Sequence, residues 1–220
     1  MPEEPVAAPL GVLGGAFDPI HNDHLTLARS ARDRLGLAAV LLSPCGRPPH
    51  RPPPQAAARD RLAMVKAALA AEERLYADDG EIDADKPSWT VDNLERLRRR
   101  FGPHQPLVLL LGADAFLGLA SWRRWRRLFD LAHIAVAARC GHSLAPTPPL
   151  AAEFAARQGP ATALTQSAAG RIHAFDAAAG ALSATMVRAA LAAGADDEHL
   201  ARLLPAPVLD YIRRCQLYSN

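Results

Sequence analysis

The stretch Leu13-Gly14-Gly15-Ala16-Phe17-Asp18-Pro19-Ile20-His21-Asn22-Asp23-His24-Leu25 decides the fold of this chain. An apolar run over residues 10–13 leads into it, and an amphipathic helical pattern follows it. This order predicts a strand, a tight turn at the paired glycines and the start of a helix. Because a helix start presents free N–H groups and a positive dipole end, the stretch favours a bound anion such as phosphate.

Two histidines stand three residues apart in this stretch. His21 and His24 would share one face of the helix if it begins by Pro19 or Ile20. An imidazole can donate a hydrogen bond to phosphate and can become cationic beside one. A zinc site is not expected, since no further His or Cys clusters with the pair, and Asp18 is interpreted as a turn residue rather than a metal ligand.

The same stretch resembles the (G)G-x-F-D-P-x-H-x-G-H signature of the nucleotidyltransferase superfamily with the H-x-G-H motif. The resemblance implies that the two histidines contact the triphosphate of a nucleotide and that Gly14, Gly15 and Phe17 belong to an ATP site. It also implies a Rossmann-like fold.

Asp23 departs from the signature, because the family has glycine at this position. A carboxylate beside a triphosphate repels it unless the carboxylate points away or pairs with a cation. We expect it to point away, toward solvent or a neighbouring cation, so that Asp23→Gly would preserve or raise activity. The alternative is a catalytically weak nucleotide-binding sensor in which Asp23 is the lesion.

Length and composition limit the classes of protein. A chain of 220 residues, half of them hydrophobic, predicts a single domain over 1–220, with residues 1–8 as a flexible tail. A net charge of +2 gives no reason to expect nucleic-acid or membrane binding. No apolar run approaches about 20 residues, and the N-terminus lacks signal-peptide features. Scattered cysteines predict reduced thiols in a cytoplasmic protein: Cys45, Cys140 and Cys215.

Apolar runs alternate with helical patterns along the chain. The expected strands lie at residues 10–13, 39–42, 74–77, 106–112, 133–137 and 171–175. Helices are expected over 25–35 and 56–71, from 87–90 onward, and from about 182. This alternation predicts an α/β fold with an open parallel sheet of about five or six strands and helices on both faces. Residues 140–170 are loop-rich and least informative, with one helical patch near 150–157.

Three further segments are candidates for substrate binding. In the Pro-rich loop 45–54, His50 and Arg51 either belong to a stiff surface loop or hold a substrate phosphate. The resemblance favours the second, because the family has a P-P-H-(K/R) segment here. In the third segment, Ser88 or Thr90 could simply cap a helix, and Trp89 could simply be packed. A P-S-(Y/W)-T segment lines the pyridine nucleotide pocket of the family, so the resemblance assigns Trp89 and Thr90 to substrate binding.

The basic, aromatic segment 121–128 has three interpretations. Binding of single-stranded nucleic acid is not favoured, since the rest of the chain is not basic. An amphipathic helix with Trp125 and Leu128 inward is the plain structural alternative. The resemblance implies that Trp122 stacks on a nicotinate ring.

Two more segments are candidates for ATP binding. Gly112 and Asp114 end the clearest strand, where open α/β sheets bind ligands, although Asp114 could equally cap the next helix. Ser183, Thr185 and Arg188 place hydroxyls and a cation at a helix start, which suits an anion. The family's I-S-(A/S)-T-x-(I/V)-R motif matches this segment and binds ATP phosphates.

Taken together, the motifs resemble those of the nicotinate-nucleotide adenylyltransferase family. The implied reaction joins ATP and nicotinate mononucleotide into deamido-NAD and pyrophosphate, with Mg²⁺ held mostly by phosphates and water. The implied catalytic residues are His21, His24 and Arg188. A preference for nicotinamide mononucleotide and a phosphopantetheine adenylyltransferase are the alternatives within the superfamily. The sequence does not fix the oligomeric state, and a homodimer is compatible with it.

Overall fold

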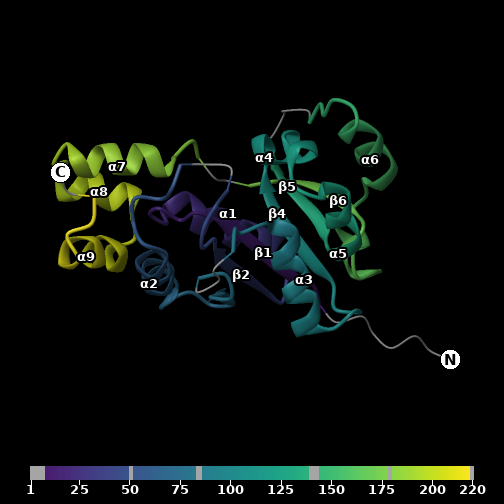
Figure 1. Ribbon diagram of the computed structural model, residues 1–220, viewed down its shortest axis with the longest axis horizontal. Helices are drawn as coiled ribbons and strands as arrows, with labels where there is room; N and C mark the ends of the chain where they lie inside the picture. The colour runs from purple at the N-terminus through teal and green to yellow at the C-terminus, as the bar shows by residue number, and fades with distance from the viewer. Residues whose placement is uncertain (1–7, 50–51, 83–85, 139–143, 178–179, 219–220) are drawn as a thin grey trace. The chain divides into compact units, whose positions relative to one another are not determined.

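The computed structural model describes residues 8–49, 52–82, 86–138, 144–177 and 180–218. Its strands form one six-stranded parallel sheet in the order β3-β2-β1-β4-β5-β6 (Figure 1). The strands are β1 (Leu10–Gly15), β2 (Ala39–Pro44), β3 (Leu75–Ala77), β4 (Leu107–Gly112), β5 (His133–Ala138) and β6 (Ile172–Asp176). The predicted α/β fold with a parallel sheet of five or six strands is confirmed.

Helices separate the strands along the chain, as the alternating pattern predicts. They are α1 (Asn22–Arg34), α2 (Ala58–Leu69), α3 (Thr90–Phe101), α4 (Ala113–Leu117), α5 (Leu128–Leu131), α6 (Leu150–Arg157), α7 (Ala184–Ala192), α8 (Asp197–Leu203) and α9 (Ala206–Arg214). Short 3-10 turns lie at Leu119–Ser121, Trp125–Arg127 and Ala161–Thr165. The helical patch predicted near 150–157 is α6, while residues 139–143 lie outside the described part.

The strand order changes direction at β1. The chain adds β2 and β3 on one side of β1 and then β4, β5 and β6 on the other. In open α/β sheets, ligands bind beyond the carboxyl ends of the strands at such a reversal. β1 ends at Gly14-Gly15, so the histidine stretch follows the strand end that this rule singles out.

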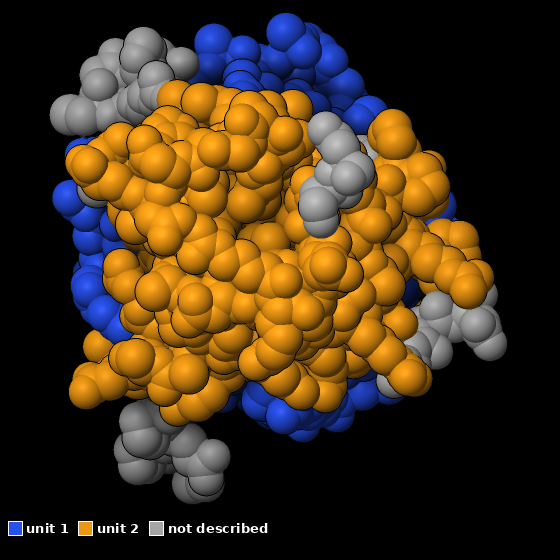
Figure 2. Space-filling view, turned by 90° about the vertical axis from the view of Figure 1, so that its left-hand side faces the viewer, with its two compact units in different colours: residues 1–13, 30–40, 89–178 blue, residues 14–29, 41–88, 179–220 orange. Residues whose placement is uncertain are grey.

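The chain divides into two compact units, coloured separately in Figure 2. Unit 1 consists of residues 1–13, 30–40 and 89–178, and unit 2 of residues 14–29, 41–88 and 179–220. The expectation of a single domain over 1–220 stays a prediction. Each unit is described by itself below.

Unit 1 is organised on β4, which is apolar on both faces. Leu107 to Leu111 are all buried, and β4 pairs in parallel with β5 at Leu109↔Ile134. Such continuous burial is typical of strands inside a covered parallel sheet. Trp125 and Leu128 are buried, as the amphipathic interpretation of this segment predicts. The single helix of that alternative does not form, because Arg124 takes a left-handed φ of 51° in this segment.

Unit 2 contains a helical core made by α2 and the C-terminal helices. α2 packs against α9, with Val65, Val208 and Ile212 buried. The Tyr211 hydroxyl donates to Oδ1 of Asp60 on α2 at 2.9 Å. The apolar C-terminal ending of the chain therefore has a structural role in this unit.

Candidate active site

The loop that joins β1 to α1 is the first part of the site. β1 runs through Gly14 and Gly15, and the left-handed φ of 49° falls on Phe17. The predicted turn at the paired glycines is therefore wrong. A Cβ at Gly14 would meet no atom within 4 Å, so a ligand can approach its backbone closely. A Cβ at Gly15 would lie 3.2 Å from the Phe17 ring, so this glycine makes room for the phenylalanine.

Two hydrogen bonds connect His21, which precedes α1, with His24 in its first turn. α1 begins at Asn22, so the condition of a helix start by Pro19 or Ile20 is not met, because residues 18–19 form a turn. The His24 N–H donates to the His21 carbonyl at 3.0 Å, and the His21 N–H donates to Nδ1 of His24 at 3.2 Å. The second bond is the return half of a capping box, with the His24 ring in place of a Glu or Gln side chain. The ring centres lie 3.7 Å apart.

The hydrogen bond to His24 fixes the tautomer of its ring, and burial sets the charge of both rings. Since Nδ1 of His24 accepts a hydrogen bond, the neutral ring carries its proton on Nε2. Burial lowers the pKa of His24 to about 3, and burial lowers the pKa of His21 to about 4 against the opposing charge of Asp23. Nδ1 of His21 is buried with no hydrogen-bond partner among the described residues. Near neutral pH both rings are therefore neutral hydrogen-bonding groups, not cations.

Phe17 supports the pair from the side. Its ring is buried and meets the His24 ring edge-on, with centres 4.9 Å apart. The structure therefore places Phe17 against a histidine that is predicted to bind ATP.

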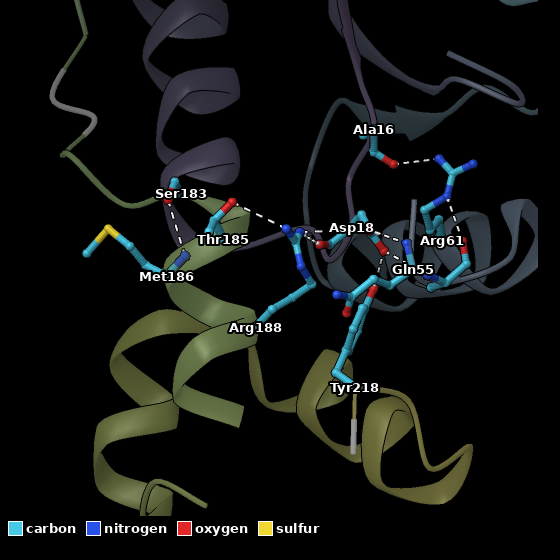
Figure 3. A network of polar contacts seen from close by, with 10 residues as sticks. Ala16, Asp18, Gln55, Arg61, Ser183, Thr185, Met186, Arg188 and Tyr218 are labelled. Carbon is cyan, nitrogen blue, oxygen red and sulfur yellow. Dashed lines mark hydrogen bonds and ion pairs between the residues drawn. The ribbon is translucent and has the colours of Figure 1, made fainter. Parts of the chain in front are cut away.

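Asp18 is the centre of a network of polar contacts (Figure 3). Its carboxylate accepts from the Gln55 N–H at 2.8 Å, the Ala56 N–H at 3.0 Å and the Tyr218 hydroxyl at 2.8 Å. Its backbone carbonyl accepts from Nη1 of Arg188 at 2.7 Å. Asp18 thus anchors the loop before α2 and the C-terminal segment, which goes beyond the turn role predicted for it.

A buried arginine supports the same loops. Arg61 on α2 is 1% exposed, and its guanidinium donates to the carbonyls of Ala16, Gly46 and Ala56. Sequence reasoning missed it. Its burial could have been inferred from its position in the helix, because Arg61 precedes the buried Met64 by about one turn and so lies on the apolar face of α2.

The start of α7 is the second part of the site within unit 2. Ser183 is the N-cap, and its Oγ accepts from the Met186 N–H at 3.3 Å. Nη2 of Arg188 donates to Oγ1 of Thr185 at 3.3 Å, while Nη1 reaches the Asp18 carbonyl. The structure therefore links the predicted Ser183, Thr185 and Arg188 group to the loop that carries the histidines.

Asp23 has a partner that the sequence did not reveal. Its Oδ2 accepts from the Leu182 N–H at 3.0 Å, one residue before the α7 cap. The expected partner, solvent or a cation, is wrong, because the backbone N–H of Leu182 in front of α7 takes the carboxylate. That the carboxylate points away from the triphosphate stays a prediction, and the Leu182 bond gives it a positive role that glycine could not supply.

The residues predicted to bind the pyridine ring lie in unit 1. Trp89 is the N-cap of α3, Thr90 is its first residue, and Trp122 follows a 3-10 turn. All three are half-buried. The guanidinium carbon of Arg123 lies 5.1 Å from the centre of the Trp89 ring, so the start of α3 and residues 122–123 lie side by side.

Gly112 and Asp114 mark the end of β4 in the same unit. Gly112 is the last residue of β4 and the N-cap of α4, and no side chain caps this helix. Asp114 is exposed in the first turn of α4. The alternative that Asp114 caps the helix therefore finds no support, and its carboxylate is accessible to a ligand.

Ser88 is a second residue that sequence reasoning assigned differently. It was considered as a cap of α3, but its Oγ accepts from the N–H groups of Gly46 and Arg47 at 2.9 and 3.2 Å. It therefore fixes the start of the Pro-rich loop. The two residues predicted to hold a substrate phosphate on this loop, His50 and Arg51, lie outside the described residues.

No resident metal site emerges from the described residues, which contain no group of three or more His, Cys, Asp or Glu able to hold an ion. Both oxygens of the Asp18 carboxylate already accept hydrogen bonds. In the described part of the chain, no helix has the length and apolar character needed to cross a membrane.

Comparisons with known proteins identify the family of this chain. The model of the cytidylyltransferase-like family matches residues 12–190. A curated protein of Dechloromonas aromatica, named "probable nicotinate-nucleotide adenylyltransferase", is 48% identical over 98% of this chain and 100% of its own length. A protein of the same name from Laribacter hongkongensis is 48% identical over 96% of this chain and 94% of its own.

Among solved structures, the chain resembles the nicotinic acid mononucleotide adenylyltransferase of Plasmodium falciparum complexed with NaAD. The TM-score is 0.73, and the match covers 96% of this chain and 98% of the other. At 14% identity this likeness supports the fold alone.

Proposed function

We propose that this chain, which belongs to the nicotinate-nucleotide adenylyltransferases of the cytidylyltransferase-like family, transfers the adenylyl group of ATP to nicotinate mononucleotide. The products are deamido-NAD and pyrophosphate, and the reaction is a step of NAD biosynthesis. We assign the histidine pair and the start of α7 to the phosphates of ATP, and the segments around Trp89 and Trp122 to the pyridine ring.

The observation that carries the proposal is the histidine pair. Nδ1 of His24 is occupied by the His21 N–H, so the ring is held with Nε2–H as its remaining donor. Nδ1 of His21 is buried and has no hydrogen-bond partner among the described residues. A neutral His24 ring held in this way can donate a hydrogen bond from Nε2–H to a triphosphate oxygen.

The start of α7 supplies the complementary charge. Arg188 is held by the Asp18 carbonyl and by Thr185, which orders its guanidinium before ATP arrives. A positioned arginine forms strong, charge-assisted hydrogen bonds to phosphate oxygens. We assign Ser183, Thr185 and Arg188 to the phosphates, together with the open backbone at Gly14.

Catalysis in this proposal consists of positioning and charge stabilisation. The phosphate oxygen of the mononucleotide is already a nucleophile, so no protein base and no covalent intermediate is needed. The histidines and Arg188 stabilise the charge that develops on the α-phosphate and on the leaving pyrophosphate. Mg²⁺ bound with the ATP phosphates supplies further charge neutralisation.

The pyridine side of the substrate is assigned to Trp89, Thr90 and Trp122. Two half-buried indoles offer stacking faces, and the start of α3 offers N–H groups and the Thr90 hydroxyl. Arg123, over the Trp89 ring, adds a positive charge to this segment. Donors and a cation favour the carboxylate of nicotinate over the amide of nicotinamide.

The proposal is tested by identifying the product. The purified chain is incubated with ATP, Mg²⁺ and nicotinate mononucleotide, and the mixture is analysed by mass spectrometry. We expect deamido-NAD and pyrophosphate in equal amounts. Pyrophosphate without a dinucleotide would contradict the assignment. So would formation of dephospho-coenzyme A in a parallel reaction with phosphopantetheine, if the mononucleotide gave no product.

Three further expectations stay predictions. Location in the cytoplasm rests on the cysteine pattern, and Cys45 and Cys215 are free thiols. A lack of nucleic-acid partners rests on the near-neutral charge. A homodimer remains compatible with the sequence.

A further inference from the structure

The two residues between the histidines both bond to the C-terminal part of unit 2. Nδ2 of Asn22 donates to the carbonyls of Arg202 at 2.9 Å and Ala201 at 3.4 Å, at the end of α8. Oδ2 of Asp23 accepts from the Leu182 N–H at 3.0 Å, just before α7. The segment that presents the histidines therefore also holds the chain on both sides of α7.

The Asp23 carboxylate lies close to the backbone of Gly180, which leaves little room for a side chain there. A Cβ at Gly180 would lie 3.1 Å from Oδ2 and 3.4 Å from Oδ1 of Asp23, tighter than nine in ten real Cβ contacts. A residue with a Cβ at position 180 would therefore require the carboxylate to shift by a few tenths of an ångström. The glycine and the aspartate therefore form a matched pair.

Helix dipoles explain how a carboxylate is tolerated here. Asp23 lies in the first turn of α1 and bonds the residue before the N-cap of α7. Helix N-termini carry positive partial charge, which stabilises a carboxylate. The same negative charge would weaken attraction for phosphate, so the benefit of Asp23 must come from its acceptor oxygen.

We propose that Asp23 is a positioning residue, which acts through Leu182 to place the start of α7 against the ATP phosphates. This inference rests on the proposed function. Arg188 has its own link to the histidine loop through the Asp18 carbonyl, and Asp23 supplies a second link at the other end of the first turn of α7. Two links fix the direction of the helix start, whereas one alone would act as a pivot.

Steady-state kinetics and ATP affinity by calorimetry test the proposal. In Asp23→Ala we expect kcat/KM for ATP to fall about tenfold, the equivalent of about 1.4 kcal/mol, and ATP affinity to weaken. The KM for nicotinate mononucleotide should stay unchanged. Asp23→Asn keeps an acceptor oxygen without the charge and should restore ATP kinetics. Asp33→Ala, an exposed aspartate on the same helix, is the matched control.

Gly180→Ala tests the matched pair. Alone it should reproduce the loss of ATP affinity, and in the Asp23→Ala background it should add nothing, because the two changes disturb one contact. Amide hydrogen exchange over residues 180–192 should rise in Asp23→Ala and stay at the wild-type level in Asp23→Asn. This readout needs no turnover, so an inactive wild type would refute the proposed function alone.

The proposal is overturned if Asp23→Ala keeps wild-type ATP kinetics and exchange. It is also overturned if Asp23→Asn is as impaired as Asp23→Ala, since charge rather than the acceptor would then matter. A loss that is equal for ATP and the mononucleotide, with a lower melting temperature, would indicate general destabilisation and would likewise overturn it.

Discussion

Asp18→Asn should destabilise unit 2 strongly, because an amide cannot replace the carboxylate at this position. One Asp18 oxygen accepts from Ala56 and Tyr218, and the other accepts from Gln55. An amide has only one oxygen, so its NH₂ group would face a backbone N–H. An unsatisfied buried donor costs about 1–3 kcal/mol, and each of the two remaining bonds loses about 1 kcal/mol with the charge.

The sum is about 3–5 kcal/mol of unfolding free energy, which for a chain of this size corresponds to a drop in Tm on the order of 10 °C. The assay is thermal unfolding followed by circular dichroism, with chemical denaturation to obtain the free energy. Asp210→Asn, an exposed aspartate on α9, is the control and should leave Tm unchanged. A Tm drop of less than about 2 °C in Asp18→Asn would refute the reasoning that this network anchors the loop.

Three further outcomes follow from the same structure. His24→Ala should fold normally but lose about 10²–10³ in kcat, since a preorganised phosphate donor is removed, and near wild-type turnover would contradict its assignment. Trp122→Ala should raise the KM of nicotinate and nicotinamide mononucleotides through lost stacking and leave the KM of ATP unchanged; an effect on ATP alone would contradict the pyridine assignment. Because folding lowers the pKa values of His21 and His24 to about 4 and about 3, the unfolded chain binds more protons below pH 6.5. Stability should therefore fall as the pH decreases from about 6.5 to about 4, by up to ~1.4 kcal/mol per pH unit for each histidine, and urea unfolding of His24→Gln should show a shallower dependence. Equal slopes for wild type and variant would contradict the buried neutral state.

The sequence was sufficient for the features that depend on local pattern. The apolar runs at residues 106–112 and 133–137 predicted β4 and β5 because buried parallel strands need continuous hydrophobicity. The hydroxyls at the start of α7 predicted a helix N-terminus because Ser183 caps it through a contact three residues away.

The sequence was not sufficient for contacts between distant parts of the chain. Tyr218 bonds to Asp18 across 200 residues, and Leu182 bonds to Asp23 across 159. No local pattern encodes such pairs, because the fold alone brings them together. The bonds that hold Asp18 before the start of α1 likewise come from distant segments, from α7 and from the loop before α2.

The central claim is tested most directly by the substrate preference of the wild-type chain. Pyrophosphate release is measured with ATP and either nicotinate or nicotinamide mononucleotide in parallel reactions. We predict a preference for nicotinate mononucleotide of at least about tenfold in kcat/KM, equal to ~1.4 kcal/mol of differential transition-state binding. Equal values would contradict the assignment of Trp89, Thr90 and Trp122 to a carboxylate-binding pocket, and no release with either mononucleotide would contradict the proposed function itself.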